Sequence, residues 1–321
     1  MQTEILFMGI YAALTLGLLL FAVMYAIYFE RKVIGYMQVR YGPNRVGPGG
    51  LLQTLTDVLK LVLKEDIIPA GVDRKVFIIA PIIAFAPSYM ILATIPWTDN
   101  LRGADLNIGI LYFIAISSIS TIGVLMGGWS SNNKYSLLGA MRSVAQMVSY
   151  EIPLVMSLVG VIILSGSMNM REIVHAQAEF GMWFVIPQFL GFIVYMISAI
   201  AEVNRSPFDL PEADSELVAG YHTEYTGFRM AFFMLAEYAY CIGVAAFATV
   251  VFFGGWLGPA FLPGIIWFLL KWACFMFLFF WLRATLPRVR VDQLMTFGWK
   301  VLIPLALLNI VITAVIKAWM G

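Results

Sequence analysis

The chain has 321 residues, of which 61% are hydrophobic and 12% are charged. This charged share is about half that of an average soluble protein, so the composition indicates an integral membrane protein. The net charge of +1 provides no general attraction for nucleic acid. The two Cys and two His form no CxxC pair and no metal-binding spacing, and neither GxGxxG nor Walker A motifs occur. We therefore expect no iron–sulfur, zinc or haem site and no binding of NADH or ATP through those motifs.

Eight apolar stretches approach the length of about 20 residues that a helix needs to cross a bilayer. We expect them at residues 5–29, 76–97, 108–128, 148–166, 182–201, 228–253, 264–282 and 299–319. The first has no basic cluster before it, and basic residues follow it, which favours a span over a cleaved signal peptide. The predicted fold class is an all-α integral membrane protein with eight transmembrane helices, in a single membrane domain of residues 1–321.

Lys and Arg are unevenly distributed between the two sets of loops. Sixteen of the twenty lie in or beside the loops after the first, third, fifth and seventh spans, whereas three lie on the other side and Lys271 lies within a span. Because basic loops stay on the cytoplasmic side, we expect both termini outside and the long loops, 30–75 and 202–227, in the cytoplasm.

A separate element lies within the first long loop. Over residues 51–64, Leu and Val recur at helical spacing, while Asp57, Lys60 and Lys64 share another face. The segment is too short to span a bilayer, so we predict an amphipathic helix at the membrane interface.

Carboxylates lie within or close to the predicted spans. Glu237 lies well inside the sixth span, Glu151 just inside the fourth, and Glu202 at the inner end of the fifth. The acidic loop that follows adds Glu212 and Glu216, which would repel each other on one helix face. Neighbouring carboxyls in a water-poor region titrate together and can pass protons, so the pattern favours a proton path.

Structural explanations remain open for these charges. Glu237 would be the partner of a buried cation such as Lys271, and the acids beside Pro211 would begin a helix in a solvated loop. The Arg residues at span ends would set the topology and contact lipid headgroups. The functional interpretation is that they dock a soluble partner and line a site for an amphiphilic ligand.

Four sequence blocks, in order, resemble one family of membrane proteins. The blocks are Glu30–Arg45 (ERKVIGYMQVRYGPNR), Gly128–Tyr135 (GWSSNNKY) with SYE at 149–151, Ala201–Ala213 (AEVNRSPFDLPEA) with SEL at 215–217, and Leu282–Ala284 (LRA) with Leu286–Leu294 (LPRVRVDQL). They are similar to the H subunit of proton-pumping NADH–quinone oxidoreductase, the membrane subunit of respiratory complex I that corresponds to mitochondrial subunit one. The resemblance extends over essentially the whole chain.

The resemblance implies a subunit of this enzyme that has no redox centre or catalytic residue of its own and forms the mouth and inner part of a quinone chamber. Quinone, the substrate, would enter from the bilayer between the first span, the amphipathic helix and the sixth span. By motif match, the residues of the chamber or its walls would be Glu30, Arg31, Arg40, Asp57, Lys60, Arg205 and Phe208. The acidic chain that couples quinone reduction to proton translocation would consist of Glu151, Glu202, Glu212, Glu216 and Glu237.

The partners that the resemblance implies are peripheral-arm subunits, one with the terminal iron–sulfur cluster, and other membrane-arm subunits. Iron–sulfur clusters and flavin would lie on those partners, and the membrane would be a bacterial plasma membrane. Two alternatives are the same fold in a membrane-bound hydrogenase-type complex and a stand-alone cation or proton transporter. Copurification distinguishes the three possibilities. Partners with flavin and iron–sulfur clusters would indicate the quinone enzyme, nickel would indicate a hydrogenase, and the absence of partners would indicate a transporter.

Overall fold

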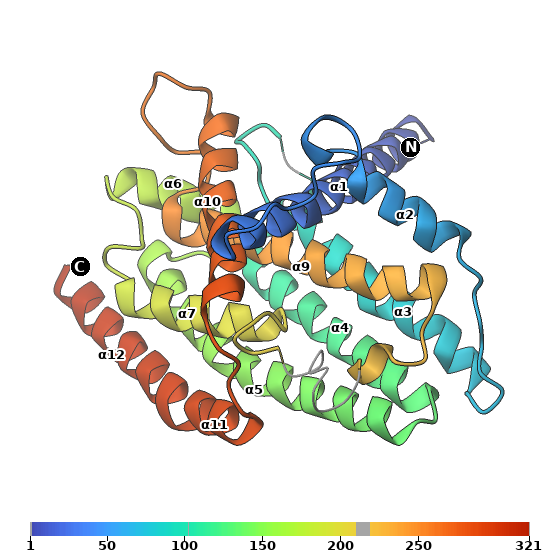
Figure 1. Ribbon diagram of the computed structural model, residues 1–321. Coiled ribbons are helices and arrows are strands. Elements are labelled where there is room, and N and C mark those ends of the chain that lie inside the picture. The colour runs from blue at the N-terminus through green and yellow to red at the C-terminus, as the bar shows by residue number, and fades with distance from the viewer. Residues whose placement is uncertain (1, 102, 210–218, 321) are drawn as a thin grey trace.

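The computed structural model describes residues 2–101, 103–209 and 219–320, which form helices and connecting segments without a strand (Figure 1). The α-helices are α1 Gln2–Met37, α2 Gln53–Leu63, α3 Arg74–Met90, α4 Gly109–Ser130, α5 Lys134–Ser165, α6 Met170–Glu179, α7 Phe189–Glu202, α9 Gly227–Phe253, α10 Gly264–Thr285, α11 Val291–Phe297 and α12 Ile303–Met320. Short 3-10 turns lie at η1 Pro48–Gly50, η2 Ile91–Thr94 and η3 Gly220–His222, and the π-helical turn η4 Gly298–Leu302 joins α11 to α12.

The all-helical membrane class is confirmed. Among the described residues, seven segments are long and apolar enough to cross a bilayer: α1, α3 with η2, α4, α5, α9, α10 and the run from α11 through α12. The predicted fifth span corresponds to α7, which has 14 residues and begins only after Pro187. At about 1.5 Å per residue this helix is shorter than the roughly 30 Å hydrocarbon core, so the count of eight spans stays a prediction.

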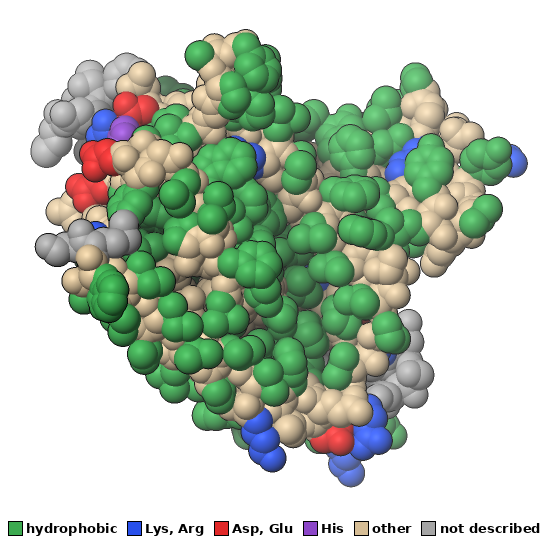
Figure 2. Space-filling view, turned by 90° about the vertical axis from the view of Figure 1, so that its left-hand side faces the viewer, with side chains coloured by type: hydrophobic (Ala, Val, Ile, Leu, Met, Phe, Trp, Pro, Cys, Tyr) green, Lys and Arg blue, Asp and Glu red, His purple; other side chains and the backbone are tan. Residues whose placement is uncertain are grey.

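Helix α9 forms the centre of the bundle. Its apolar stretch is 83% buried, whereas that of α1 is 17% buried. It packs against α1, α3 and α10, while α4 lies between α3 and α5, and α5 also contacts α7 and α12 (Figure 1). Gly243 on α9 permits close packing against η2, because a Cβ there would lie 2.6 Å from the Ile91 side chain. The outer face in Figure 2 is largely hydrophobic, with most charged side chains near its edges.

Local hydrogen bonds explain several helix ends. The side chain of Asn133 accepts a hydrogen bond from the Tyr135 amide at the start of α5, and that of Asn169 accepts one from the Arg171 amide at the start of α6. Gly166 adopts a left-handed φ of 73° and ends α5. These contacts satisfy backbone groups that a helix leaves unpaired at its ends.

The helix predicted over residues 51–64 is confirmed as α2, Gln53–Leu63. Its Thr54 is buried, and Leu55, Val58, Leu59 and Val62 are exposed on the outer side. Its location at the membrane interface stays a prediction. Helix α6, which was not predicted, begins with the Asn169 cap.

A buried polar contact holds the short helix α7. Gln188 donates to the Thr313 hydroxyl over 2.7 Å and accepts from the Asn309 amide over 2.8 Å. Gly160 on α5 provides the necessary space, because a Cβ there would lie 2.2 Å from Gln188 Oε1. This contact links α12 to the residue before α7, and so helps to position the far end of α7, where Glu202 lies.

Candidate functional site

Three charged residues from distant parts of the sequence form a buried charge cluster. Glu30 lies in α1 and is 4% exposed, Arg205 follows α7 and is 7% exposed, and Arg283 lies in α10. Arg205 Nη1 lies 3.2 Å from both carboxylate oxygens of Glu30, and Arg283 Nη1 donates to the same carboxylate. The carboxylate of Glu30 therefore faces both guanidinium groups.

The Arg205 guanidinium is only partly satisfied by this pairing. Its Nε and Nη2 atoms are buried and have no hydrogen-bond partner, and its central carbon lies 4.1 Å from the centre of the Tyr238 ring on α9. Burial acts to lower the pKa of Arg205, but the carboxylates of Glu30 and Glu237 raise it, and the net shift is upward. Unpaired buried donors each cost about 1–3 kcal/mol, so a ligand oxygen that accepts from them would be stabilised.

Of the other predicted chamber residues, Phe208 lies beside Arg205, with its amide 2.9 Å from the Arg205 carbonyl oxygen, whereas the rest lie away from the buried pairing. Arg31 on α1 and Asp57 on α2 form an ion pair of 2.5 Å and are 45% and 33% exposed. Arg40 is exposed and donates to the Gln38 side chain, and Lys60 is exposed on α2. Phe208 is buried, with its ring 5.7 Å from that of Tyr150 and its carbonyl bonded to Gln146. The predicted set therefore divides into an outer part on α2 and the adjacent surface, and an inner part around Arg205.

A small internal cavity brings two of the predicted acids together. It has a volume of about 30 Å³, and Glu202 and Glu237 both line it. Its polar lining also includes Ser88, Ser120, Asn204, Tyr221 and Tyr240. A volume of this size holds about two water molecules. The cavity thus provides a polar space between α3, α4, α7 and α9.

Tyrosine hydroxyls orient the carboxylates of this cavity. Tyr240 donates to Glu202 Oε1 over 2.5 Å, and Tyr221 donates to Glu237 Oε1 over 2.9 Å. The second oxygen of Glu202 is buried without a partner. A carboxyl oxygen in this state can accept a hydrogen bond from water or carry the proton of a neutral carboxyl.

Glu151 extends the group of acids beyond the cavity. It lies on α5 and accepts a hydrogen bond from the Ser118 hydroxyl on α4. It is also close enough to Glu202 for their charges to interact. Glu212 and Glu216 lie outside the described residues. The structure therefore relates Glu151, Glu202 and Glu237 to one another, and Glu237 to Arg205.

Lys271 on α10 is not the partner of Glu237, so that example of a buried cation is wrong, whereas the buried cation Arg205 does interact with the charge of Glu237. Its ammonium group donates to the carbonyls of Phe253, Gly255 and Leu257 at 2.5–3.0 Å. These carbonyls lie at and beyond the C-terminal end of α9, where helix carbonyls lack amide partners and a cation is favourable. Lys271 therefore stabilises the end of α9.

Sequence reasoning did not identify Tyr221 and Tyr240 as partners of the acids, and it did not include Arg283 among the chamber residues. A usable signal existed for Tyr240, because it follows Glu237 by three residues and therefore shares its helix face, although its partner is Glu202. The pairing of Arg283 with Glu30 joins residues 253 apart, and no local pattern predicts it.

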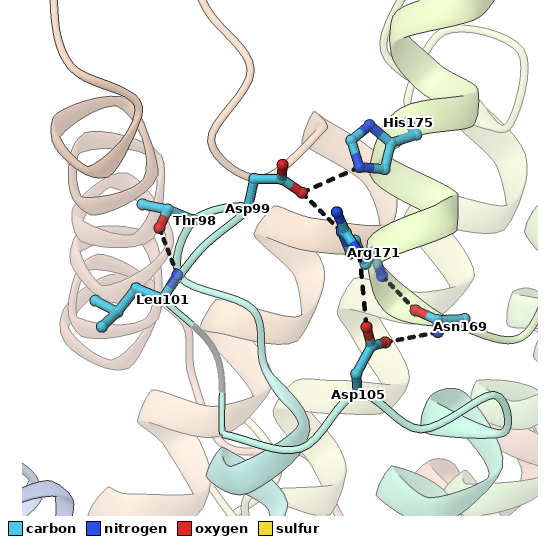
Figure 3. Close-up of polar contacts among 7 residues, drawn as sticks. All are labelled: Thr98, Asp99, Leu101, Asp105, Asn169, Arg171 and His175. Atoms are coloured by element: carbon cyan, nitrogen blue, oxygen red, sulfur yellow. Dashed lines mark hydrogen bonds and ion pairs between the residues drawn. The ribbon is translucent and has the colours of Figure 1, made fainter. Parts of the chain in front are cut away.

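A second group of ion pairs, the exposed charge cluster, lies between the segment before α4 and helix α6 (Figure 3). Its members are Asp99, Asp105, Asn169, Arg171 and His175. Arg171 lies 2.7 Å from Asp99 and 3.7 Å from Asp105, and His175 lies 3.2 Å from Asp99. The hydrogen bond from Arg171 is the main cause that lowers the pKa of Asp99. The cluster ties the segment before α4 to α6.

Neither cluster resembles a metal site, since no group of three His, Cys, Asp or Glu suited to a metal ion occurs in the part of the chain that the structure describes. Cys241 and Cys274 are free thiols.

Comparison with known proteins gives matches along almost the whole chain. The family model described as NADH dehydrogenase matches residues 10–314. The H subunit of NADH-quinone oxidoreductase from Brevibacillus brevis is 60% identical over 312 residues, which are 96% of this chain and 92% of the relative. The corresponding protein of Geobacillus kaustophilus is 59% identical over 318 residues (98% and 95%), and that of Bacillus cytotoxicus is 61% identical over 308 residues (94% and 92%). The resemblance of the four sequence blocks is thereby confirmed, and the chain belongs to the NADH dehydrogenase family of membrane subunits.

Proposed function

We propose that the chain is a membrane subunit of a proton-translocating NADH–quinone oxidoreductase that lines the path of the quinone and couples its reduction to proton movement. The observation that carries the proposal is Arg205, a buried cation beside Glu30 with two donors that have no hydrogen-bond partner. The relatives named above are subunits of an NADH-quinone oxidoreductase, which supports the same conclusion.

The chemistry of a quinone suits this arrangement. Its carbonyl oxygens accept hydrogen bonds, and reduction places negative charge on them, which the unpaired Nε and Nη2 of Arg205 would stabilise. Its isoprenoid tail needs an apolar route from the bilayer. The exposed apolar residues of α1 and α2, such as Leu18, Phe21 and Leu59, would provide the beginning of that route.

The seven predicted chamber residues would act at two depths. Arg31, Asp57 and Lys60 would lie at the portal, by which we mean the access route between α1, α2 and α9, and Arg40 would lie on the exposed surface after α1. Glu30, Arg205 and Phe208 would form the inner wall. The peripheral subunits that carry the flavin and the iron–sulfur clusters would close the chamber from the cytoplasmic side of a bacterial plasma membrane, with both termini of this chain outside.

Coupling would pass through charge. A negative quinone near Arg205 would weaken the interaction between Arg205 and Glu237, and Glu237 shares a cavity with Glu202. A change in the proton affinity of one carboxyl changes that of its neighbours, so protons would move along Glu237, Glu202 and Glu151. Glu212 and Glu216 would complete the chain from the chamber.

The test of the chamber is substitution of Arg205 in the assembled complex. Arg205→Gln should raise the KM for quinone about tenfold or more, because a hydrogen bond to a charged group is lost. Arg205→Lys should have a smaller effect, since it keeps the charge but loses the planar array of donors. Arg171→Gln, in the exposed charge cluster, is the matched control. An unchanged KM in a correctly assembled Arg205→Gln complex would contradict the proposal.

The test of coupling is Glu202→Gln in complexes reconstituted into vesicles. We expect fewer protons translocated per electron while quinone reduction continues. Tyr240→Phe removes only the hydrogen bond to Glu202, so it should lower the number of protons translocated per electron less than Glu202→Gln does. Equal ratios in wild type and Glu202→Gln would show that this carboxyl is not needed for coupling.

A further inference from the structure

We propose that Asp66 and Arg229 are positioning residues that fix the C-terminal end of α2 on α9 and thereby set the width of the portal for the quinone tail. The proposal rests on the proposed function, because it concerns the access route to the same chamber. Its starting point is the ion pair between Asp66 Oδ2 and Arg229 Nη2, which is 3.0 Å long and links the segment after α2 to the first turn of α9.

The backbone reinforces this ion pair. The amide of Ile67 donates to the Thr226 hydroxyl over 3.1 Å, immediately before α9 begins. Gly227 has a φ of +56°, and a Cβ at this position would lie 3.1 Å from the Lys64 carbonyl oxygen. The segment 64–67 therefore lies directly against the start of α9, in a conformation that favours glycine there.

Arg229 is itself held on a rigid base. Its guanidinium lies 5.6 Å from the centre of the Phe77 ring on α3, and its side chain is only 19% exposed. Phe77 stacks on Tyr225 with ring centres 4.0 Å apart and planes within 4°. Asp66 is the carboxylate with which Arg229 pairs, so its replacement by a neutral residue would remove the opposite charge of that pair.

The other end of α2 has a weaker attachment. Arg31 and Asp57 link it to α1, and their side chains are 45% and 33% exposed, against 19% for Arg229 and 40% for Asp66. The difference lies in the arginine, which is more exposed at this end. Exposed ion pairs contribute little to stability and break readily. Thr54, which precedes both Asp57 and Asp66 in the chain, is the buried residue of α2, and its hydroxyl has no partner.

This asymmetry gives the two attachments different roles. The end of α2 near α9 has an ion pair, a backbone hydrogen bond and close backbone packing, so it forms the fixed point. The helical part of α2 near α1 has the exposed pair, and the hydrogen bond from the Tyr28 hydroxyl of α1 to the Gly49 carbonyl lies before α2 begins. This end is therefore the side at which the portal widens when a quinone passes. Removal of the fixed point would change access of the tail without changing the groups that face the quinone head.

The experiment uses the assembled complex in proteoliposomes with graded amounts of a long-tailed quinone, and in parallel a short-tailed quinone. Asp66→Asn should raise the apparent KM for the long-tailed quinone about two- to fivefold, since an ion pair of this exposure has a modest effect. The kcat should stay unchanged, and the short-tailed quinone should be affected less. The exchange Asp66→Arg with Arg229→Asp should restore the KM.

The matched control is Asp99→Asn, which breaks a comparable ion pair, 2.7 Å long and with the Asp 42% exposed, away from α2. It should leave both KM values unchanged. The positioning role is overturned if Asp66→Asn leaves the KM unchanged, or if it lowers kcat for both quinones and the exchange does not restore it. Arg205→Gln, measured alongside, separates the two proposals: if it also has no effect, the chamber itself is wrong, and if only Asp66→Asn has none, the positioning role alone fails.

Discussion

The buried and the exposed charge clusters contain the same kinds of side chains but differ in how completely these are satisfied. In the exposed cluster, Arg171 pairs with Asp99 and Asp105, and water reaches all of them. In the buried cluster, Glu30 faces both Arg205 and Arg283, and two donors of Arg205 have no partner. Leaving buried donors unpaired costs stability, so such an arrangement is typical of a site that meets a ligand, whereas the exposed cluster ties loops together.

The largest effect should come from removal of the shared anion of the buried cluster. Glu30→Gln leaves two cations without this opposing charge in a water-poor site, and we expect a loss of about 3–5 kcal/mol in the free energy of unfolding. Heat denaturation of the purified complex, followed through this subunit, measures the loss. A stability equal to that of wild type would mean that water already screens Glu30.

An intermediate effect is expected at His222, which is buried between Tyr221 and Phe233 and whose Nε2 has no partner. Burial lowers its pKa to about 4. The unfolded chain, with a pKa of about 6.5, binds a proton between these values and the folded chain does not, so stability falls as the pH falls from about 6.5 to 4. At pH 5 the free energy of unfolding should be about 2 kcal/mol lower than at neutral pH because of this residue.

Thermal unfolding at pH 7 and pH 5 measures the contribution of His222 to the pH dependence of stability. The variant His222→Phe, which cannot titrate at this position, is the comparison. The variant should lose less stability than wild type between the two pH values. An identical pH dependence in both proteins would show that His222 does not contribute to it.

The smallest effect is expected in the exposed cluster. Asp99→Asn and Arg171→Gln remove ion pairs that water and salt already screen, so neither should shift the unfolding temperature measurably at about 0.15 M salt. The same measurement at low salt sharpens the comparison, because a small difference should emerge there. A large shift of the unfolding temperature at physiological salt would mean that these ion pairs stabilise the fold as much as those of the buried cluster do, which would contradict the comparison.

Hydrophobic length and periodicity predicted most of the helices, because these signals depend on consecutive residues. The amphipathic pattern of residues 51–64 gave α2 within two residues at its start and one at its end. The predicted span 182–201 was longer than α7, because Pro187 and the turns before it delay the helix start although the residues are apolar. Helix α6 is short and has little hydrophobicity, so a search for apolar membrane spans does not detect it.

The candidate site was predictable by residue type but not by pairing. The acids in the spans stood out by their position, and the family resemblance assigned Glu30 and Arg205 to the chamber. The sequence could not indicate that Glu30 meets Arg205, 175 residues away, or that the side chain of Lys271 turns toward the end of α9 rather than toward Glu237. Such contacts depend on how helices pack, which no local pattern records.

Photo-crosslinking of the wild-type complex with a quinone analogue tests the central claim most directly. After digestion, the labelled peptides of this subunit are mapped. The proposed chamber predicts label within residues 1–65 and 200–240, around α1, α2 and Arg205. Label confined to other parts of the chain, such as α12 or the exposed charge cluster, would contradict it.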